Sequence, residues 1–317
     1  MRPLRVGVAV AAVPLLLVML LAPSWAPPGA AAGDAPVATV VSAEAIEYWH
    51  RRDGSDPARP DGRASISEVH TRELFHRGAH VYAVAFPSGR LLLTKRSSRM
   101  LAFPGGFNLV GEHHAPAASP GRFETDEECA ARAFQEELGW RLPADRFFNL
   151  WRDGGRVREY DRPSGRGRRD RMNLSDVVLV ISDDEVLAGL GAGPGHAALT
   201  ADPPPIPAGG APGGGRRGKV APPPTFVPAA DGAWRFDPAE VDSVALAPLA
   251  WVFRWLTAGD PAGMCNADVS RFVLEGLVGL CRATVGLPTS PLTIAAGHQA
   301  ETLCGEARRF PGPFLFP

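Results

Sequence analysis

Residues 124–140 read ETDEECAARAFQEELGW, and this stretch decides the fold that the sequence predicts. Thr125 is a residue type that caps helix starts, and Glu128 three positions later completes a capping box. Gly139 is typical of the residue that follows a helix end. The sequence therefore predicts a helix over 126–138, with an apolar stripe at helical spacing formed by Ala130, Phe134 and Leu138.

Upstream of this helix the pattern changes to that of strands. Residues 81–86 and 91–95 are rich in β-branched and apolar side chains, and Pro87-Ser88-Gly89 between them is turn chemistry. We predict a hairpin there, followed by a loop over 97–123 that is rich in proline and glycine. Within the helix, Arg132 and Glu136 are spaced to form an i, i+4 ion pair.

The loop and helix together resemble the Nudix box, whose pattern is G-x5-E-x7-R-E-U-x-E-E-x-G-U, with U a bulky apolar residue. The matching residues are Glu124, Arg132, Phe134, Glu136, Glu137 and Gly139. Two positions depart from the pattern: Ala118 replaces the leading glycine, and Ala133 replaces the glutamate after the arginine. The resemblance covers residues 76–258 and implies an α/β/α sandwich with a mixed sheet.

Nudix enzymes cleave a diphosphate linked to another group, so the resemblance implies a small-molecule diphosphate substrate and bound Mg²⁺ or Mn²⁺. It implies three metal ligands, Glu124, Glu136 and Glu137, and a loop-bracing role for Arg132. Glu137 and Arg132 would therefore belong to the catalytic machinery. Ala133 cannot be a ligand or a base, and Glu112 in the preceding loop is the candidate that would compensate for it.

Positively charged residues near the end of the predicted hairpin are candidates for binding substrate phosphate. Lys95 and Arg96 end the second strand, and a guanidinium group suits phosphate oxygens. His113 is a third candidate, although loop packing is the alternative for this residue. Glu159 and Glu240 are acids outside the box that could complete a metal site.

Three segments also resemble the isopentenyl diphosphate isomerase branch of the family: HRGAHVYAV (76–84), LLLTKRSS (91–98) and FPGGFNLVGEHH (103–114). The isomerases protonate an alkene with a loop cysteine and a later glutamate. This loop has no cysteine, and NLSDVVLV (173–180) lacks the acidic motif of the isomerases. The resemblance therefore implies isomerase-like architecture without isomerase catalysis. For His76 and His80, near the first strand, structural roles are expected.

The chain has 317 residues and a net charge of −1, which gives no electrostatic case for nucleic-acid binding. Residues 1–32 read as a signal peptide, so we expect the secretory pathway or the extracellular space, with a membrane anchor as the alternative. No stable membrane span is expected after cleavage. The sequence leaves the oligomeric state open.

No two cysteines are spaced as in a zinc site. Cys129 is expected to be a buried thiol, and pairing among the others stays open: Cys265, Cys281 and Cys304.

The remaining segments complete the predicted organisation. We expect an extended N-terminal segment over 37–75 and a disordered Gly/Pro-rich insert over 188–231 within the Nudix domain. A C-terminal helix and tail occupy 259–317. Further strands are expected at 147–152, 157–160, 176–181 and 243–247, and helices at 248–256 and 267–285. Five arginines near 162–171 form a basic loop that is either solvated or binds an anion.

Three functions are consistent with these features. The first is a metal-dependent Nudix-type hydrolase. The second is a Nudix-fold binding module without catalysis, which would hold an anionic ligand with Lys95, Arg96 and the basic loop. The third is an isopentenyl diphosphate isomerase-like enzyme. A working metal cluster distinguishes the first from the second.

Overall fold

The computed structural model describes residues 44–50, 60–100, 104–116, 124–150, 156–161, 169–191, 224–228, 233–257 and 277; for 156–161, 169 and 170 only the backbone is described. No helix within these ranges has both the length and the hydropathy needed to cross a bilayer. Several predictions lie outside the described residues: the segment 1–32, Ala118, the arginines of 162–168, the helix over 267–285 (apart from Leu277), and Cys265, Cys281 and Cys304.

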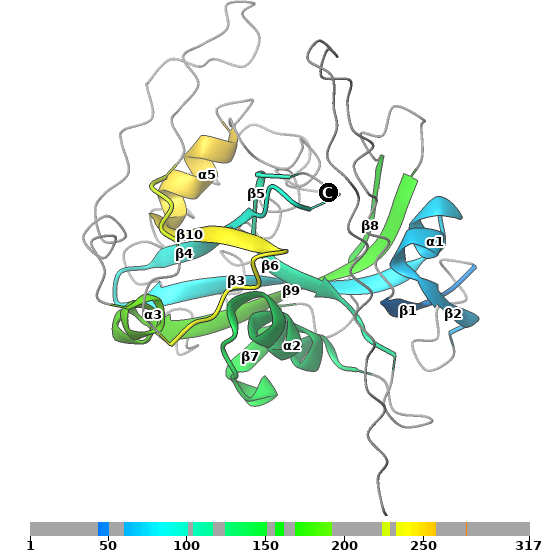
Figure 1. The fold of residues 1–317 in the computed structure, drawn as a ribbon, viewed down its shortest axis with the longest axis horizontal. Helices are drawn as coiled ribbons and strands as arrows, with labels where there is room; N and C mark the ends of the chain where they lie inside the picture. Colours follow the sequence, from blue (N-terminus) through cyan, green and yellow to red (C-terminus); the bar gives the residue numbers. More distant parts are fainter. Residues whose placement is uncertain are drawn as a thin grey trace, which may run out of the picture. The chain divides into compact units, whose positions relative to one another are not determined.

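A mixed eight-stranded sheet is the centre of the described fold (Figure 1). Its main path runs in the order β10 (Val241–Pro248), β4 (Arg90–Arg96), β3 (His76–Phe86), β9 (Arg169–Ser182) and β7 (Phe147–Asn149). Three further strands pair with this path: β5 (Phe107–Asn108) with β4, β6 (Val110–His113) with β3, and β8 (Arg156–Asp161) with β9. Because β3 is parallel to β9 and antiparallel to β4, the sheet is mixed.

Helices cover both faces of this sheet, and the alternation of side chains along β3 shows why. Val81, Ala83 and Ala85 pack with α2 (Asp126–Leu138) and α3 (Asp183–Leu190). Tyr82 and Val84 point the other way and pack with α5 (Leu249–Thr257), since successive residues of a strand face opposite sides. The predicted α/β/α sandwich with a mixed sheet is therefore confirmed.

The helix α2 begins and ends where its sequence predicts. The Thr125 side chain accepts a hydrogen bond from the backbone of Glu128, and the Glu128 side chain accepts one from the backbone of Thr125. Gly139 follows the helix in a left-handed conformation with φ 67°, and its backbone N–H donates to Gln135. The predicted hairpin is also confirmed as β3 and β4.

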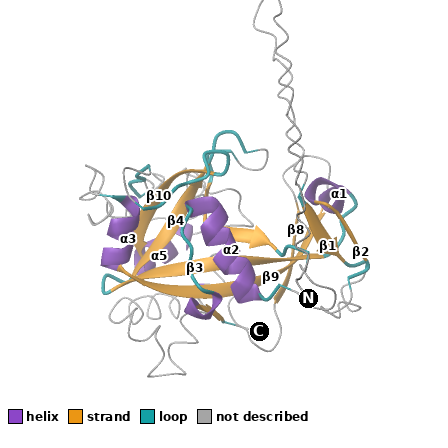
Figure 2. Ribbon diagram, turned by 60° about the horizontal axis from the view of Figure 1, so that its bottom comes forward, coloured by secondary structure: helices purple, strands orange, loops and turns teal. Residues whose placement is uncertain are grey.

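The described part of residues 37–75 is folded, where the sequence predicted an extended segment. β1 (Ala45–Tyr48) and β2 (Gly62–Ser65) form an antiparallel pair, and α1 (Ile66–Thr71) follows. Ile46, Val69 and Leu74 form a small core of their own. Figures 1 and 2 show this unit beside the ends of β3 and β9. The charged residues between the two strands concealed the apolar pattern in the sequence.

The two ends of the predicted insert also belong to the described fold. α3 ends at Leu190, inside the segment 188–231. Val227 pairs with Val244 of β10 through two backbone hydrogen bonds. Trp234, just after this segment, is buried against Trp140 and Gly189. A short 3-10 helix, η1 (Ala144–Arg146), precedes β7.

Candidate metal and active site

The two carboxylates at the end of α2 have different environments. Glu137 is buried, and its Oε1 accepts a hydrogen bond of 2.9 Å from the backbone N–H of Gly111. Burial raises the pKa of Glu137 well above its usual range, and the charge of Glu112 adds to the increase. Glu136 is about half exposed and lies 2.8 Å from Nη1 of Arg132. The helix thus presents one carboxylate to the strand β6 and one toward solvent.

Arg132 joins the helix to the loop in front of it. Its Nε lies 2.8 Å from Glu124 Oε1, and another of its nitrogens donates to the backbone carbonyl of His113. The second oxygen of Glu124 accepts a hydrogen bond of 2.7 Å from the backbone of Ala115. These contacts agree with the expected bracing role of Arg132. They also engage both oxygens of Glu124, which holds the loop against α2.

Glu112 contacts the neighbouring His113 and also interacts with other carboxylates. Its Oε1 accepts a hydrogen bond of 2.7 Å from the backbone of His113 and is 3.2 Å from Nδ1 of the same residue. Burial alone would raise the pKa of Glu112, but the hydrogen bonds and charge of His113 lower it overall, with help from Arg132. Glu112 is therefore closely engaged with a histidine as well as near other acids.

Glu240, an acid outside the box, is brought close to the same group. Its backbone carbonyl accepts a hydrogen bond of 2.7 Å from the backbone N–H of Ser97, at the end of β4. In the adjacent turn, the backbone N–H of Asp237 donates to the backbone carbonyl of Glu137, which joins the turn to α2. Burial raises the pKa of Glu240 to about 7, with contributions from the negative charges of Glu112, Asp237 and Glu136. We call Glu112, Glu136, Glu137 and Glu240 the acidic cluster.

Positive charge also reaches the acidic cluster. The charge of Arg96 opposes the increase in the pKa of Glu137 and of Glu240. Lys95, the residue before it, is opposite Ser243 and Phe107 in the sheet. Glu44 of the N-terminal unit approaches from another side: burial, Glu112 and Glu136 raise its pKa, and its carboxylate lies 3.9 Å from Arg132.

Ala133, the departure from the box, lies within the core. Its side chain is fully buried in the cluster that contains Cys129, Ala130 and Phe134. Glu137 is one turn further along the helix and is also buried, so the two positions lie on neighbouring parts of one face. The helix therefore has no carboxylate at position 133, and the members of the acidic cluster outside α2 come from β6 and from the turn before β10.

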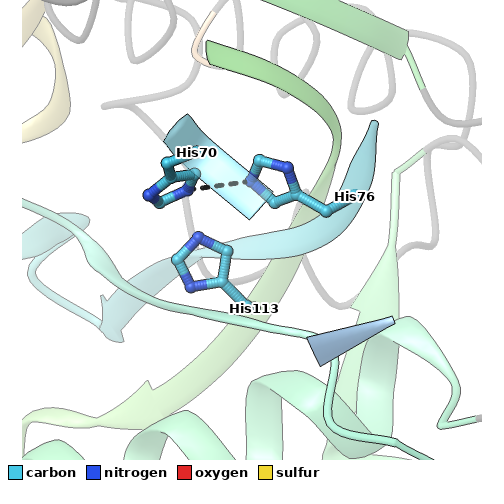
Figure 3. A group of neighbouring side chains, drawn as sticks. All are labelled: His70, His76 and His113. Atoms are coloured by element: carbon cyan, nitrogen blue, oxygen red, sulfur yellow. Dashed lines mark hydrogen bonds between the residues drawn. The ribbon is translucent and has the colours of Figure 1, made fainter. Parts of the chain in front are cut away.

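Sequence reasoning did not identify a group of three histidines beside the acidic cluster. His70 lies in the last turn of α1, His76 begins β3, and His113 ends β6; we call them the histidine cluster (Figure 3). One ring nitrogen from each lies within 4.8 Å of the others. His114 lies apart: its ring contacts Asp126 and the backbone of Glu124. The spacing of histidines in the segments 70–76 and 113–114 was the available signal.

No protein family matches this sequence, and no curated protein matches it. Among solved structures, the chain is similar to a protein of Deinococcus radiodurans, with 15% identity and a TM-score of 0.38 over 72% of this chain and 98% of that chain. It is similar to a MutT/nudix family protein of Enterococcus faecalis, with 17% identity and a TM-score of 0.25 over 38% and 45% of the two chains. It is also similar to the NUDIX domain of Shewanella oneidensis NrtR, solved with ADP ribose, with 14% identity and a TM-score of 0.31 over 67% and 96%. At these identities and TM-scores, the likeness assigns no activity to the chain.

Proposed function

We propose that this chain is a Nudix-type hydrolase that cleaves a diphosphate linkage in a small molecule with the help of Mg²⁺ or Mn²⁺. The observation that carries the proposal is the acidic cluster at the end of α2, where Glu137 is buried and positioned by Gly111. Carboxylates gathered in this way raise one another's pKa, as Glu240 illustrates, and a divalent cation would offset their repulsion. Mg²⁺ prefers oxygen ligands of this kind.

Each part of the site would have a separate task. Glu136, Glu137 and Glu240 would hold the metal, which when bound neutralises diphosphate charge and lowers the pKa of a coordinated water. Arg132 and Glu124 would keep the loop fixed against α2 through their ion pair. Arg96, with Lys95 and His113, would bind the phosphate oxygens of the substrate.

Two residues compete for the role that a box glutamate would fill at position 133. The sequence favours Glu112, but one oxygen of this carboxylate is engaged with His113. Glu240 approaches from the turn before β10, and its charge interacts with both Glu112 and Glu136. We therefore propose that Glu240 supplies the missing carboxylate. Residues 1–32 would direct the chain into the secretory pathway, with a membrane anchor as the alternative.

The test is release of phosphate or nucleotide from a panel of diphosphate compounds, with and without Mg²⁺ or Mn²⁺. The panel includes ADP-ribose, dinucleoside polyphosphates and isopentenyl diphosphate, whose isomerisation is followed separately. Metal-dependent turnover should be lost in the Glu136→Gln/Glu137→Gln variant. It should persist in Glu127→Gln, which changes a carboxylate at the opposite end of the same helix.

Comparison of Glu240→Gln with Glu112→Gln then assigns the missing carboxylate. Loss of metal-dependent turnover in Glu240→Gln and its retention in Glu112→Gln would support Glu240. The reverse result would assign the role to Glu112. No turnover of any compound by a folded chain would favour the binding module without catalysis, an alternative that the absence of a carboxylate at Ala133 supports. Isomerisation without hydrolysis would favour the isomerase-like alternative.

A further inference from the structure

The guanidinium group of Arg132 is shared by three carboxylates from three parts of the chain. Its Nε lies 2.8 Å from Oε1 of Glu124, and its Nη2 contacts the other oxygen of Glu124 at 3.2 Å and also the carbonyl of His113. Two of the three nitrogens are therefore engaged with the loop. The third, Nη1, lies 2.8 Å from Oε2 of Glu136 and 3.9 Å from Oε1 of Glu44. This nitrogen is thus shared by a residue of α2 and a residue of the N-terminal unit.

The N-terminal unit determines the position of Glu44. This residue immediately precedes β1, and its backbone carbonyl accepts a hydrogen bond of 3.1 Å from the N–H of Ile66, the first residue of α1. Two backbone hydrogen bonds of 2.8 and 3.0 Å between Trp49 and Phe75 join the unit to the residue before β3. These contacts hold the backbone of Glu44, while its side chain, which is 40% exposed, extends to Arg132.

Metal binding by Glu136, as proposed above, would disturb this arrangement. Glu136 cannot serve a divalent cation and Nη1 of Arg132 equally well, because the two positive groups would repel each other across one carboxylate. The contact between Glu136 and Arg132 is a partly exposed i, i+4 pair, which is a weak kind of ion pair. Nη1 would then need another acceptor. The carboxylate of Glu44 is roughly 1 Å beyond the distance of a charged hydrogen bond, so a small side-chain movement brings it into contact.

We propose that Glu44 is a positioning residue of the metal site, which receives Nη1 of Arg132 when Glu136 turns to the metal. This inference rests on the proposed hydrolase and adds to it a residue outside the Nudix box. Arg132 would keep its two contacts with Glu124 throughout, so the loop stays fixed while one nitrogen changes partner. The alternative is a weak surface ion pair without a role in metal binding, which the distance of 3.9 Å would also allow.

The change of partner would link metal binding to the N-terminal unit. If metal binding strengthens the contact between Glu44 and Arg132, this contact strengthens metal binding to the same extent, because the two equilibria are coupled. Backbone amides of β1 and α1 should therefore exchange with solvent more slowly when Mg²⁺ is bound. Deuterium exchange followed by mass spectrometry measures this effect independently of turnover. Glu44→Gln should remove it.

The affinity of the full chain for Mn²⁺ is the main readout, measured from the electron paramagnetic resonance signal of the free ion. We expect Glu44→Gln to weaken binding about two- to fivefold, the size expected for a partly exposed ion pair. Its unfolding midpoint without metal should match that of Glu68→Gln, the control in α1, where Glu68 pairs with Arg72 at the surface. A role in folding alone would lower this midpoint and leave the affinity unchanged, and this result would overturn the proposal.

Arg132→Lys separates the proposed change of partner from a general effect of charge. A lysine has one charged nitrogen and cannot serve Glu124 and Glu44 together. In this background Glu44→Gln should leave the Mn²⁺ affinity unchanged, whereas an equal weakening in both backgrounds would overturn the proposal. If Arg132→Lys does not fold, deuterium exchange of the parent decides: equal exchange of β1 and α1 with and without Mg²⁺ would overturn it.

Failure of the hydrolase and failure of this inference give different results. Absence of Mn²⁺ binding by the folded parent, or its retention in Glu136→Gln/Glu137→Gln, would overturn the metal site and this inference with it. Mn²⁺ binding that is lost in that double variant, but is equally strong in Glu44→Gln and Glu68→Gln, would overturn only the role of Glu44.

Discussion

At position 133 a single methyl group occupies a fully buried place in α2. A glutamate there would restore the Nudix pattern, but it would place a carboxylate among Cys129, Ala130 and Phe134. We therefore expect Ala133→Glu to lower the free energy of unfolding by roughly 3 kcal/mol, since overpacking and an unpaired buried charge are both destabilising. Urea unfolding measures the change.

Gln135→Glu is the control for this substitution, because position 135 is exposed on the same helix. It should change stability little. If Ala133→Glu were as stable as Gln135→Glu and gained affinity for Mg²⁺, position 133 would face the acidic cluster. The alanine would then be a loss of function that one substitution repairs.

Cys129 is the free cysteine among the described residues, and its thiol is fully buried. Burial raises the pKa of this thiol well above its usual value, and the negative charges of Glu124 and Glu112 act in the same direction. Because the thiolate is the reactive form, Cys129 should resist alkylation in the native chain near pH 8. Mass spectrometry of the peptide that contains it should show labelling only after denaturation. Rapid native labelling would contradict this burial.

The C-terminal end of α2 depends on a glycine for two separate reasons. Gly139 has φ 67°, and a Cβ there would lie 2.7 Å from the carbonyl oxygen of Arg235. Gly105 has nearly the same φ, 68°, but no atom within 4 Å of such a Cβ. Gly105→Ala should therefore cost about 1 kcal/mol from backbone strain alone. Gly139→Ala should lower the free energy of unfolding by on the order of 2 kcal/mol more, because Arg235 must move.

If Gly105→Ala and Gly139→Ala lowered the free energy of unfolding equally, in thermal or urea unfolding, the backbone of Arg235 would move aside without strain. A larger cost for Gly139→Ala would show that the close approach is required. The close approach matters for the site, because Arg235 donates to the carbonyl of Leu138 and Asp237 donates to that of Glu137. The same segment continues to Glu240, so a displaced segment should also reduce metal-dependent turnover.

Elements with local signals were predictable from the sequence, and those that need distant partners were not. The limits of α2 follow from Thr125, Glu128 and Gly139, all of which act within one turn of the helix ends. By contrast, the parallel pairing of β3 with β9 joins His76 to Met172, and no local pattern selects that register. The folding of the N-terminal unit was missed because its two strands are separated by a charged segment.

The candidate sites divide in the same way. Glu136, Glu137 and Arg132 are recognisable because they share one helix with fixed spacing. Glu240 becomes interpretable only when β10 pairs with β4 and brings the preceding turn to the end of α2. His70 joins His113 only when α1 folds against the sheet, so the spacing of the histidines in the sequence does not by itself show that they meet.

Asp126 connects several elements of the described fold. It accepts hydrogen bonds from Arg77 of β3 and Asn149 of β7, and it contacts Nε2 of His114. Burial alone would raise the pKa of Asp126, but His114, Arg77 and the hydroxyl of Ser175 lower it overall. A lowered pKa in the folded state stabilises the fold above the unfolded value of about 3.9, and this stabilisation is lost as the pH falls through the folded value.

Asp126→Asn should therefore destabilise the chain by roughly 1.5–3 kcal/mol near neutral pH, because it removes charged hydrogen bonds. The difference from the parent should shrink below about pH 4, where the parent carboxylate itself becomes protonated. Free energies of urea unfolding at several pH values measure both effects. Asp145→Asn, at an exposed position in η1, should stay close to the parent throughout. If the Asp126→Asn difference were the same at every pH, the charge of Asp126 would not contribute, and its role would be limited to hydrogen bonds that asparagine cannot make.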